Sequence, residues 1–140
     1  MRNRKKQIIY GVLLLAALGL NLYLTLQPPA QTVRLSEGLR LWLKQFGIYS
    51  DFHSFRSNAH LAVYFVVGIL LTLFGRECGW KWWLILLMGA ALGLVDEGVK
   101  YFLPTREFEV VDLVRDCIGV AVAILVIWLS KKVYLRQLKK

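Results

Sequence analysis

The hydrophobic residues of this chain gather into four runs that polar segments separate. The spans predicted from these runs cover residues 8–26, 58–74, 82–103 and 111–129. A helix rises about 1.5 Å per residue, so the first run is roughly 28 Å long, close to the ~30 Å hydrocarbon core of a bilayer. The pattern predicts an all-α, polytopic membrane protein with four transmembrane helices. We expect residues 1–140 to form a single membrane domain.

The polar loop between the first two spans, residues 27–57, carries a helical pattern of its own. It begins with a Pro-Pro pair, and Ser36 is placed to cap a helix. Apolar residues then recur at helical spacing: Leu35, Leu39, Trp42, Leu43 and Phe46. We predict an interfacial amphipathic helix here. It would serve either as a brace on the membrane surface or as a lid over a site.

Three of the predicted spans each carry a row of polar and small residues on one helix face. The rows are His60, Tyr64 and Gly68 in the second span, Gly89, Gly93 and Glu97 in the third, and Asp112, Asp116 and Gly119 in the fourth. Small residues let helices approach closely, so these faces are expected to point into the protein. Ionisable groups at membrane depth are costly unless they pair, face water or hold a ligand. The rows therefore predict a functional site.

Composition and charge agree with a membrane location. Hydrophobic residues make up 57% of the 140 residues, and the mean hydropathy is +0.52, too high for a soluble domain of this size. A net charge of +9 suits nucleic acid, but the basic residues lie beside the apolar runs and form no soluble basic stripe. The predicted partner is thus the lipid bilayer, and no nucleic acid is expected.

The basic residues also predict an orientation. Most of them lie at span ends that share one side of the membrane: Arg2, Arg4, Lys5, Lys6, Arg76, Lys81, Lys131, Lys132, Arg136, Lys139 and Lys140. The positive-inside rule makes this side cytoplasmic, with both termini on it. Every acidic residue except Glu77 then belongs to the outer part of the chain. The predicted site accordingly faces away from the cytoplasm.

The residues of the site suggest its chemistry. The candidates for catalysis are His60, Glu97, Asp112 and Asp116, and the candidates for ligand binding are Arg106, Lys100 and Tyr64. His60 or Glu97 would act as general acid or base, and the planar fork of Arg106 would bind a phosphate or carboxylate. Because an unpaired charge is costly there, Glu97 is expected within hydrogen-bonding distance of His60, Lys100 or Arg106.

The two aspartates of the fourth span leave several alternatives open. Carboxylates one helical turn apart can bind a divalent cation, shift each other's titration, or pair with Arg106 and Lys100. A DxxxD pair alone is weak evidence for a metal, so no metal ligands are predicted. The sequence identifies no cofactor.

The order of these residues resembles the VanZ-like membrane proteins. The resemblance rests on His60-x-x-x-Tyr64, Asp96-Glu97, Pro104-x-Arg106, Asp112, an acid at 116, and Gly119. It implies a small multi-pass protein of the bacterial plasma membrane. The namesake of the family is associated with resistance to lipid-tailed glycopeptide antibiotics such as teicoplanin. The chain departs from the family pattern at residues 56 and 57, at Lys100, where a Gln is frequent, and at Asp116, where an Asn is frequent. Lys100 and Asp116 are candidates for a compensating pair.

Two classes of function fit this sequence. In the first, the protein is an enzyme that acts on a lipid-linked precursor or another phosphate- or carboxylate-bearing molecule of the cell envelope. In the second, it is a non-catalytic protein that binds a lipid or a lipid-tailed antibiotic. A charge network with a purely structural role is the remaining alternative.

Overall fold

The computed structural model describes residues 3–49, 51–103 and 108–137, without the side chains of residues 29, 53, 56, 57, 135 and 136. This part of the chain is all-helical and contains no strand. Its helices are α1 (Arg4–Leu26), α2 (Pro29–Lys44), α3 (Phe52–Cys78), α4 (Trp82–Tyr101) and α5 (Val110–Gln137). The predicted all-α fold class is confirmed.

Three stretches of the described chain are long and apolar enough to cross a membrane. They are Arg4–Leu26, Asn58–Cys78 and Trp82–Tyr101, which correspond to the first three predicted spans. Large apolar side chains such as Leu15, Leu20 and Leu87 are exposed along these helices, as expected for faces that contact lipid. The fourth predicted span lies within α5, and its passage through the membrane stays a prediction, as does the interfacial position of α2.

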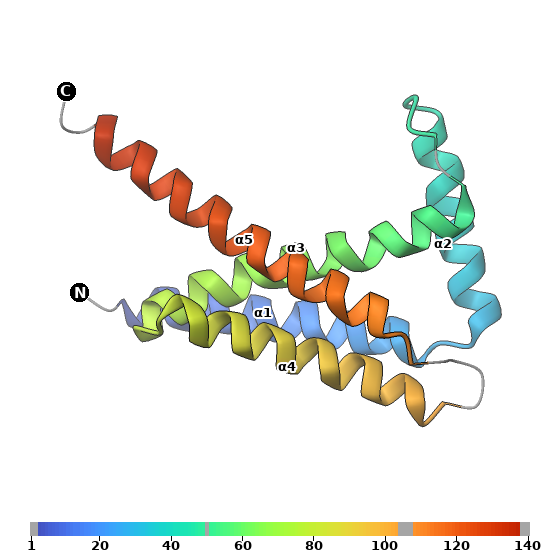
Figure 1. Ribbon diagram of the computed structural model, residues 1–140, viewed down its shortest axis with the longest axis horizontal. Coiled ribbons are helices and arrows are strands. Elements are labelled where there is room, and N and C mark those ends of the chain that lie inside the picture. The colour runs from blue at the N-terminus through green and yellow to red at the C-terminus, as the bar shows by residue number, and fades with distance from the viewer. Residues whose placement is uncertain (1–2, 50, 104–107, 138–140) are drawn as a thin grey trace.

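α1, α3, α4 and α5 run back and forth along one another (Figure 1). α3 packs most extensively against α5, and it also contacts α1, α4 and α2. Both chain ends lie at one end of the molecule, whereas the α1–α2 connection, the end of α4 and the start of α5 lie at the other (Figure 1). α2 and the start of α3 project at that second end. The C-terminal part of α5 diverges from the other helices.

Local signals explain where α3 begins and ends. The carboxylate of Asp51 accepts a hydrogen bond from the backbone amide of Ser54 at 2.9 Å, so the helix begins at Phe52, earlier than the predicted residue 58. At the other end Gly79 adopts φ +81°, a left-handed conformation that glycine tolerates best. Only two residues then separate this glycine from α4, and the α3–α4 turn is correspondingly tight.

The predicted capping role of Ser36 is wrong. Ser36 lies in the middle of α2, which begins at Pro29 and has Pro28 as its N-cap residue. Proline suits the first turn of a helix because its missing N–H is not needed there and its φ is already near the helical value. The Pro-Pro pair at the beginning of the loop therefore starts the helix.

The other boundaries differ modestly from the predicted ones. α4 ends at Tyr101, shortly before the predicted residue 103, and α5 continues to Gln137, beyond the predicted residue 129. A proline disfavours a helical conformation of the residue before it, so Pro104 predicts the span's end at residue 103. Pro104 itself lies outside the described residues.

Glycines bring α3, α4 and α5 into close contact. A Cβ atom at Gly68 would lie 2.8 Å from the Cα of Val120, and one at Gly89 would lie 2.7 Å from a methyl carbon of the same valine. One at Gly119 would lie 2.8 Å from the backbone oxygen of Leu61. The prediction that these small residues face neighbouring helices is confirmed.

Candidate functional site

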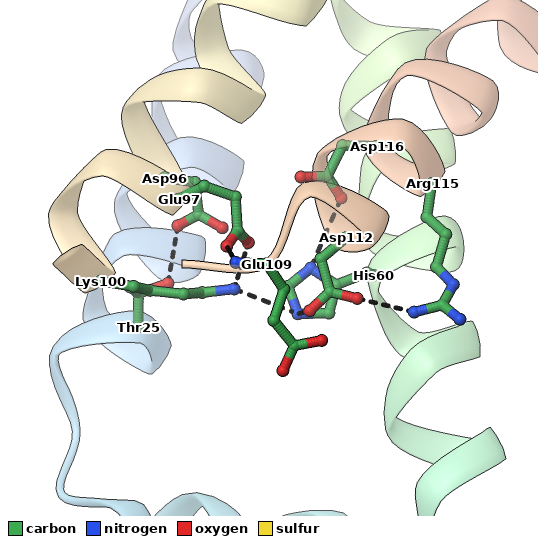
Figure 2. Close-up of polar contacts among 9 residues, drawn as sticks. All are labelled: Thr25, His60, Asp96, Glu97, Lys100, Glu109, Asp112, Arg115 and Asp116. Carbon is green, nitrogen blue, oxygen red and sulfur yellow. Dashed lines mark hydrogen bonds and ion pairs between the residues drawn. The ribbon is translucent and has the colours of Figure 1, made fainter. Parts of the chain in front are cut away.

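The polar residues of the three rows meet near the end of the bundle where α1 and α4 end and α5 begins (Figure 2). The side chains come from α3 (His60), α4 (Asp96, Glu97 and Lys100) and α5 (Asp112, Arg115 and Asp116), with Thr25 from α1. Residues separated by as many as 71 positions are in hydrogen-bond contact here. The site is therefore a product of helix packing rather than of one local motif.

Glu97 is completely buried and is satisfied at both carboxylate oxygens. Its Oε1 accepts a hydrogen bond from the Lys100 ammonium. Its Oε2 accepts one from the backbone N–H of Glu109 at 3.2 Å. The predicted contact between Glu97 and a nearby basic residue is confirmed. Pairing of this kind is what allows a carboxylate to remain in a buried position.

His60 lies between two carboxylates that α5 supplies. Its Nε2 is 3.4 Å from Asp112 Oδ2, and its Nδ1 is 3.4 Å from Asp116 Oδ1. Asp112 also accepts a hydrogen bond from Arg115 Nη1 at 2.8 Å. On the side of α4, Lys100 Nζ lies 3.4 Å from His60 Nε2. The imidazole can thus exchange partners according to which of its nitrogens carries a proton.

Two of the aspartates hold carboxylate oxygens without hydrogen-bond partners among the described residues. Asp96 is 5% exposed, and its Oδ1 accepts a hydrogen bond from Thr25 Oγ1 at 2.7 Å, whereas its Oδ2 has no such partner. Asp116 is 0% exposed, and neither of its oxygens has one. Most buried polar groups are hydrogen-bonded, so these oxygens call for an explanation.

Close backbone packing brings these groups together. A Cβ atom at Gly93 would lie 3.2 Å from the Cβ of Asp116, so glycine lets α4 approach the carboxylate on α5. Gly119, one turn after Asp116, contacts the backbone of α3 next to Tyr64. The two glycines bring the aspartate close to both α4 and His60.

The remaining predicted site residues differ in their placement. Tyr64 is 1% exposed, one turn from His60 along α3. Arg106 lies outside the described residues. The suggested pair of Lys100 and Asp116 is replaced by other contacts, since Lys100 binds Glu97 and Asp116 lies beside His60. The reason is helical spacing: Glu97 and Lys100 are neighbours on the same helix face.

A cavity of about 210 Å³ opens next to the site. Its polar lining includes His60, Asp96 and Lys100. Four uncharged polar residues also line it: Asn21, Thr25, Thr32 and Ser36. The apolar part of its wall comes from α1, α2 and α3: Leu24, Leu35, Leu39, Phe55, Ala59 and Val63. Tyr64 is not part of this lining. The cavity therefore changes from charged to apolar across its walls.

Sequence reasoning missed two contributors to the site. Thr25 is the last polar side chain before the end of α1 and is 5% exposed, yet the apolar run around it has no period that would fix its direction. Asp96 belongs to the Asp96-Glu97 pair, but no role was predicted for it. A hydroxyl within an otherwise apolar span is the signal that would have found Thr25, because such groups seek partners inside membrane proteins.

These features define a class: a helical membrane protein with a buried cluster of ionisable residues beside an amphipathic cavity. Residues 8–131 match the VanZ/LLP1 family, and the chain belongs to that family. No curated protein matches the chain, and no solved structure matches it.

Proposed function

We propose that this VanZ/LLP1 protein binds an amphipathic molecule of the bacterial cell envelope, with its polar end against the buried cluster and its apolar part along the helices. The observation that carries this proposal is the cavity of about 210 Å³, whose lining passes from His60, Asp96 and Lys100 to apolar side chains. Small-molecule sites combine an apolar wall with a few convergent polar groups in this way.

A second hollow supports a lipid-like occupant. It has a volume of about 300 Å³ and lies between α1 and α3. Its lining is almost wholly apolar and shares Asn21, Leu24 and Val63 with the cavity at the site. An acyl or polyprenyl chain would extend from the cavity along this hollow. Within a bilayer the chain would be held there by van der Waals packing against the helices, because lipid tails are as apolar as the lining side chains.

The polar end of the ligand would meet Lys100 and Arg106, the two basic residues that the sequence predicts to bind it. A guanidinium binds phosphate or carboxylate groups in two-pronged fashion, whereas an ammonium acts as a point charge. A lipid-linked precursor or a lipid-tailed glycopeptide carries such groups. From the resemblance we propose a plasma-membrane location with the site on the outer side and a contribution to resistance against lipid-tailed glycopeptides.

Catalysis is the second candidate, and the position of His60 favours it. An imidazole with carboxylates 3.4 Å from each ring nitrogen is oriented to accept and return a proton. Glu97 and the aspartates would hold it in that orientation. A His60→Gln variant separates the two candidates, because loss of an enzyme would make unconverted substrate accumulate in the cell envelope, whereas loss of a protein that only binds would cause no such accumulation.

The test of ligand binding is to block the cavity. Ala59→Phe places an aromatic ring in its wall, and we expect the purified variant to retain about tenfold less co-purifying amphiphile than the unaltered protein, a difference of 1.4 kcal/mol. Mass spectrometry of the bound lipids provides the measurement. The matched control is Ala121→Phe, at an exposed position of α5. Equal retention by both variants, or no retention by the unaltered protein, would contradict the proposal.

A further inference from the structure

The ionisable cluster contains a set of groups that suits a metal ion. Four residues each offer one ligand atom, and these atoms all lie within 4.8 Å of one another: His60, Asp96, Glu97 and Asp116. We name them the carboxylate–imidazole cluster. Ligand atoms at about 2.0–2.2 Å from a cation lie roughly 3–4 Å apart, so a small contraction would complete a coordination sphere. We infer that the carboxylate–imidazole cluster binds one divalent transition-metal ion.

The unpartnered oxygens point to the same conclusion. Both oxygens of Asp116 and the Oδ2 of Asp96 are buried and lack hydrogen-bond partners among the described residues. Asp116 is 0% exposed and Asp96 is 5% exposed, so water provides little compensation. The Lys100 ammonium is engaged by Glu97, and the Arg115 guanidinium is engaged by Asp112. A dication would neutralise the two carboxylates that these basic residues do not pair with, those of Asp96 and Asp116.

The surroundings of the cluster resemble the second layer of a metal site. Ligand carboxylates are usually hydrogen-bonded at their other oxygen, and ligand histidines usually donate their other N–H to a carboxylate. Thr25 donates to Asp96 Oδ1 at 2.7 Å, which leaves Oδ2 for the metal. Asp112 Oδ2 lies 3.4 Å from His60 Nε2, which leaves Nδ1 for the metal beside Asp116.

Binding of the metal would select one form of His60. In the structure Nδ1 lies 3.4 Å from Asp116 Oδ1, whereas Nε2 lies 3.4 Å from both Lys100 Nζ and Asp112 Oδ2. With a metal bound, Nδ1 would be a ligand and Nε2–H would donate to Asp112. Glu97 is already satisfied at both oxygens, so it would add the fourth ligand after the other three are in place.

The donor set indicates the class of metal. Imidazole nitrogen suits transition metals such as Zn²⁺, and carboxylate oxygens suit Mn²⁺, so one imidazole with three carboxylates can accept either ion. Mg²⁺ and Ca²⁺ prefer oxygen ligands throughout. His60, Asp96 and Lys100 also line the cavity, which provides a path by which an ion can enter.

The experiment uses the full chain, purified without a histidine tag in detergent, stripped with a chelator and then titrated with Mn²⁺ or Zn²⁺ alone. We expect one ion per chain by elemental analysis and a ¹⁴N coupling in the Mn²⁺ electron spin-echo spectrum. Asp116→Asn should bind no Mn²⁺ at concentrations that saturate the unaltered protein. Glu109→Gln is the control, since the Glu109 side chain is exposed and its contact with Glu97 uses the backbone amide.

A second variant covers the case in which Asp116→Asn fails to fold. Thr25→Val removes only the outer hydrogen bond to Asp96 and should weaken Mn²⁺ binding about tenfold. The inference is overturned if the folded, stripped protein binds no metal, if the ¹⁴N coupling is absent, or if Thr25→Val and Glu109→Gln bind with equal affinity. The titration contains no lipid, so its result is independent of the proposed ligand binding.

Discussion

At Glu97 the cost of burying a charge is offset by two specific donors. The Lys100 ammonium and the Glu109 backbone N–H satisfy its two oxygens, and the side chain has no exposed surface. Breaking a buried ion pair from one side is strongly destabilising, because the remaining charge is left without a partner. Glu97 therefore contributes to the stability of the protein whichever function the site has.

The corresponding prediction concerns Glu97→Gln. The amide keeps the shape of the side chain but leaves the Lys100 ammonium buried without a counter-charge, so we expect a loss of about 3 kcal/mol in the free energy of unfolding. Loss of helical content in a denaturing-detergent titration measures it. Glu109→Gln should remain within about 0.5 kcal/mol of the unaltered protein. If the two variants have the same free energy of unfolding, the Lys100 ammonium does not require Glu97 as its counter-charge.

Much of the site at this scale could be predicted because helical periodicity is visible in one sequence. The spacing placed His60 with Tyr64 and Asp112 with Asp116 on inward faces, and burial of Tyr64 and Asp116 agrees. The contacts between helices could not be predicted in the same way. The pairing of His60 with α5 depends on the register between helices, which periodicity along one helix does not encode.

At the scale of elements, α3 contacts each of the other four helices. Glycines set its distance from α5. A Cβ atom at Gly119 would lie 2.8 Å from Leu61 O and 2.9 Å from Phe65 N. Both are backbone atoms of α3, so no side-chain rotation can relieve the contact. The glycines can be identified from the sequence. Which of them touches the backbone of a neighbouring helix and which faces open space cannot be predicted from it.

Two glycine-to-alanine substitutions, one at a tight helix contact and one at an open position, test this close approach. Gly119→Ala should force α3 and α5 apart and lower the free energy of unfolding by about 1–3 kcal/mol. It should also separate His60 from Asp116 and thereby weaken Mn²⁺ binding. Gly98→Ala in α4, where nothing lies within 4 Å of the added carbon, should be neutral or stabilising by up to about 1 kcal/mol. Two variants of equal stability would contradict the close approach.

The start of α2 shows that a local capping signal does not by itself fix where a helix begins. Ser36 is a good capping residue and Pro29 is a good first-turn residue, and both precede apolar residues at helical spacing. The helix begins at Pro29 because the longer helix adds backbone hydrogen bonds that a start at Ser36 would lose. As a result α2 reaches far enough for Thr32 and Leu35 to line the cavity.

For the whole molecule, the arrangement of the helices relates the site to the termini. Both termini lie at one end of the bundle, and the end of α4 and the start of α5, next to the site, lie at the other (Figure 1). Whichever side of the membrane holds the termini, the site faces the opposite side if the chain crosses completely. The basic residues near both termini then predict an outward-facing site through the positive-inside rule.

Labelling in intact cells tests this orientation. In a Cys117→Ser background, a cysteine at Gly38, in α2, should react with a membrane-impermeant maleimide, because α2 lies at the end of the bundle near the site. The native Cys78, at the end of α3, should react only after the cells are permeabilised. Its free thiol is half-buried, so labelling after permeabilisation is the control that shows it can react. Labelling of Cys78 in intact cells, with Gly38→Cys protected, would reverse the orientation and place the site in contact with the cytoplasm.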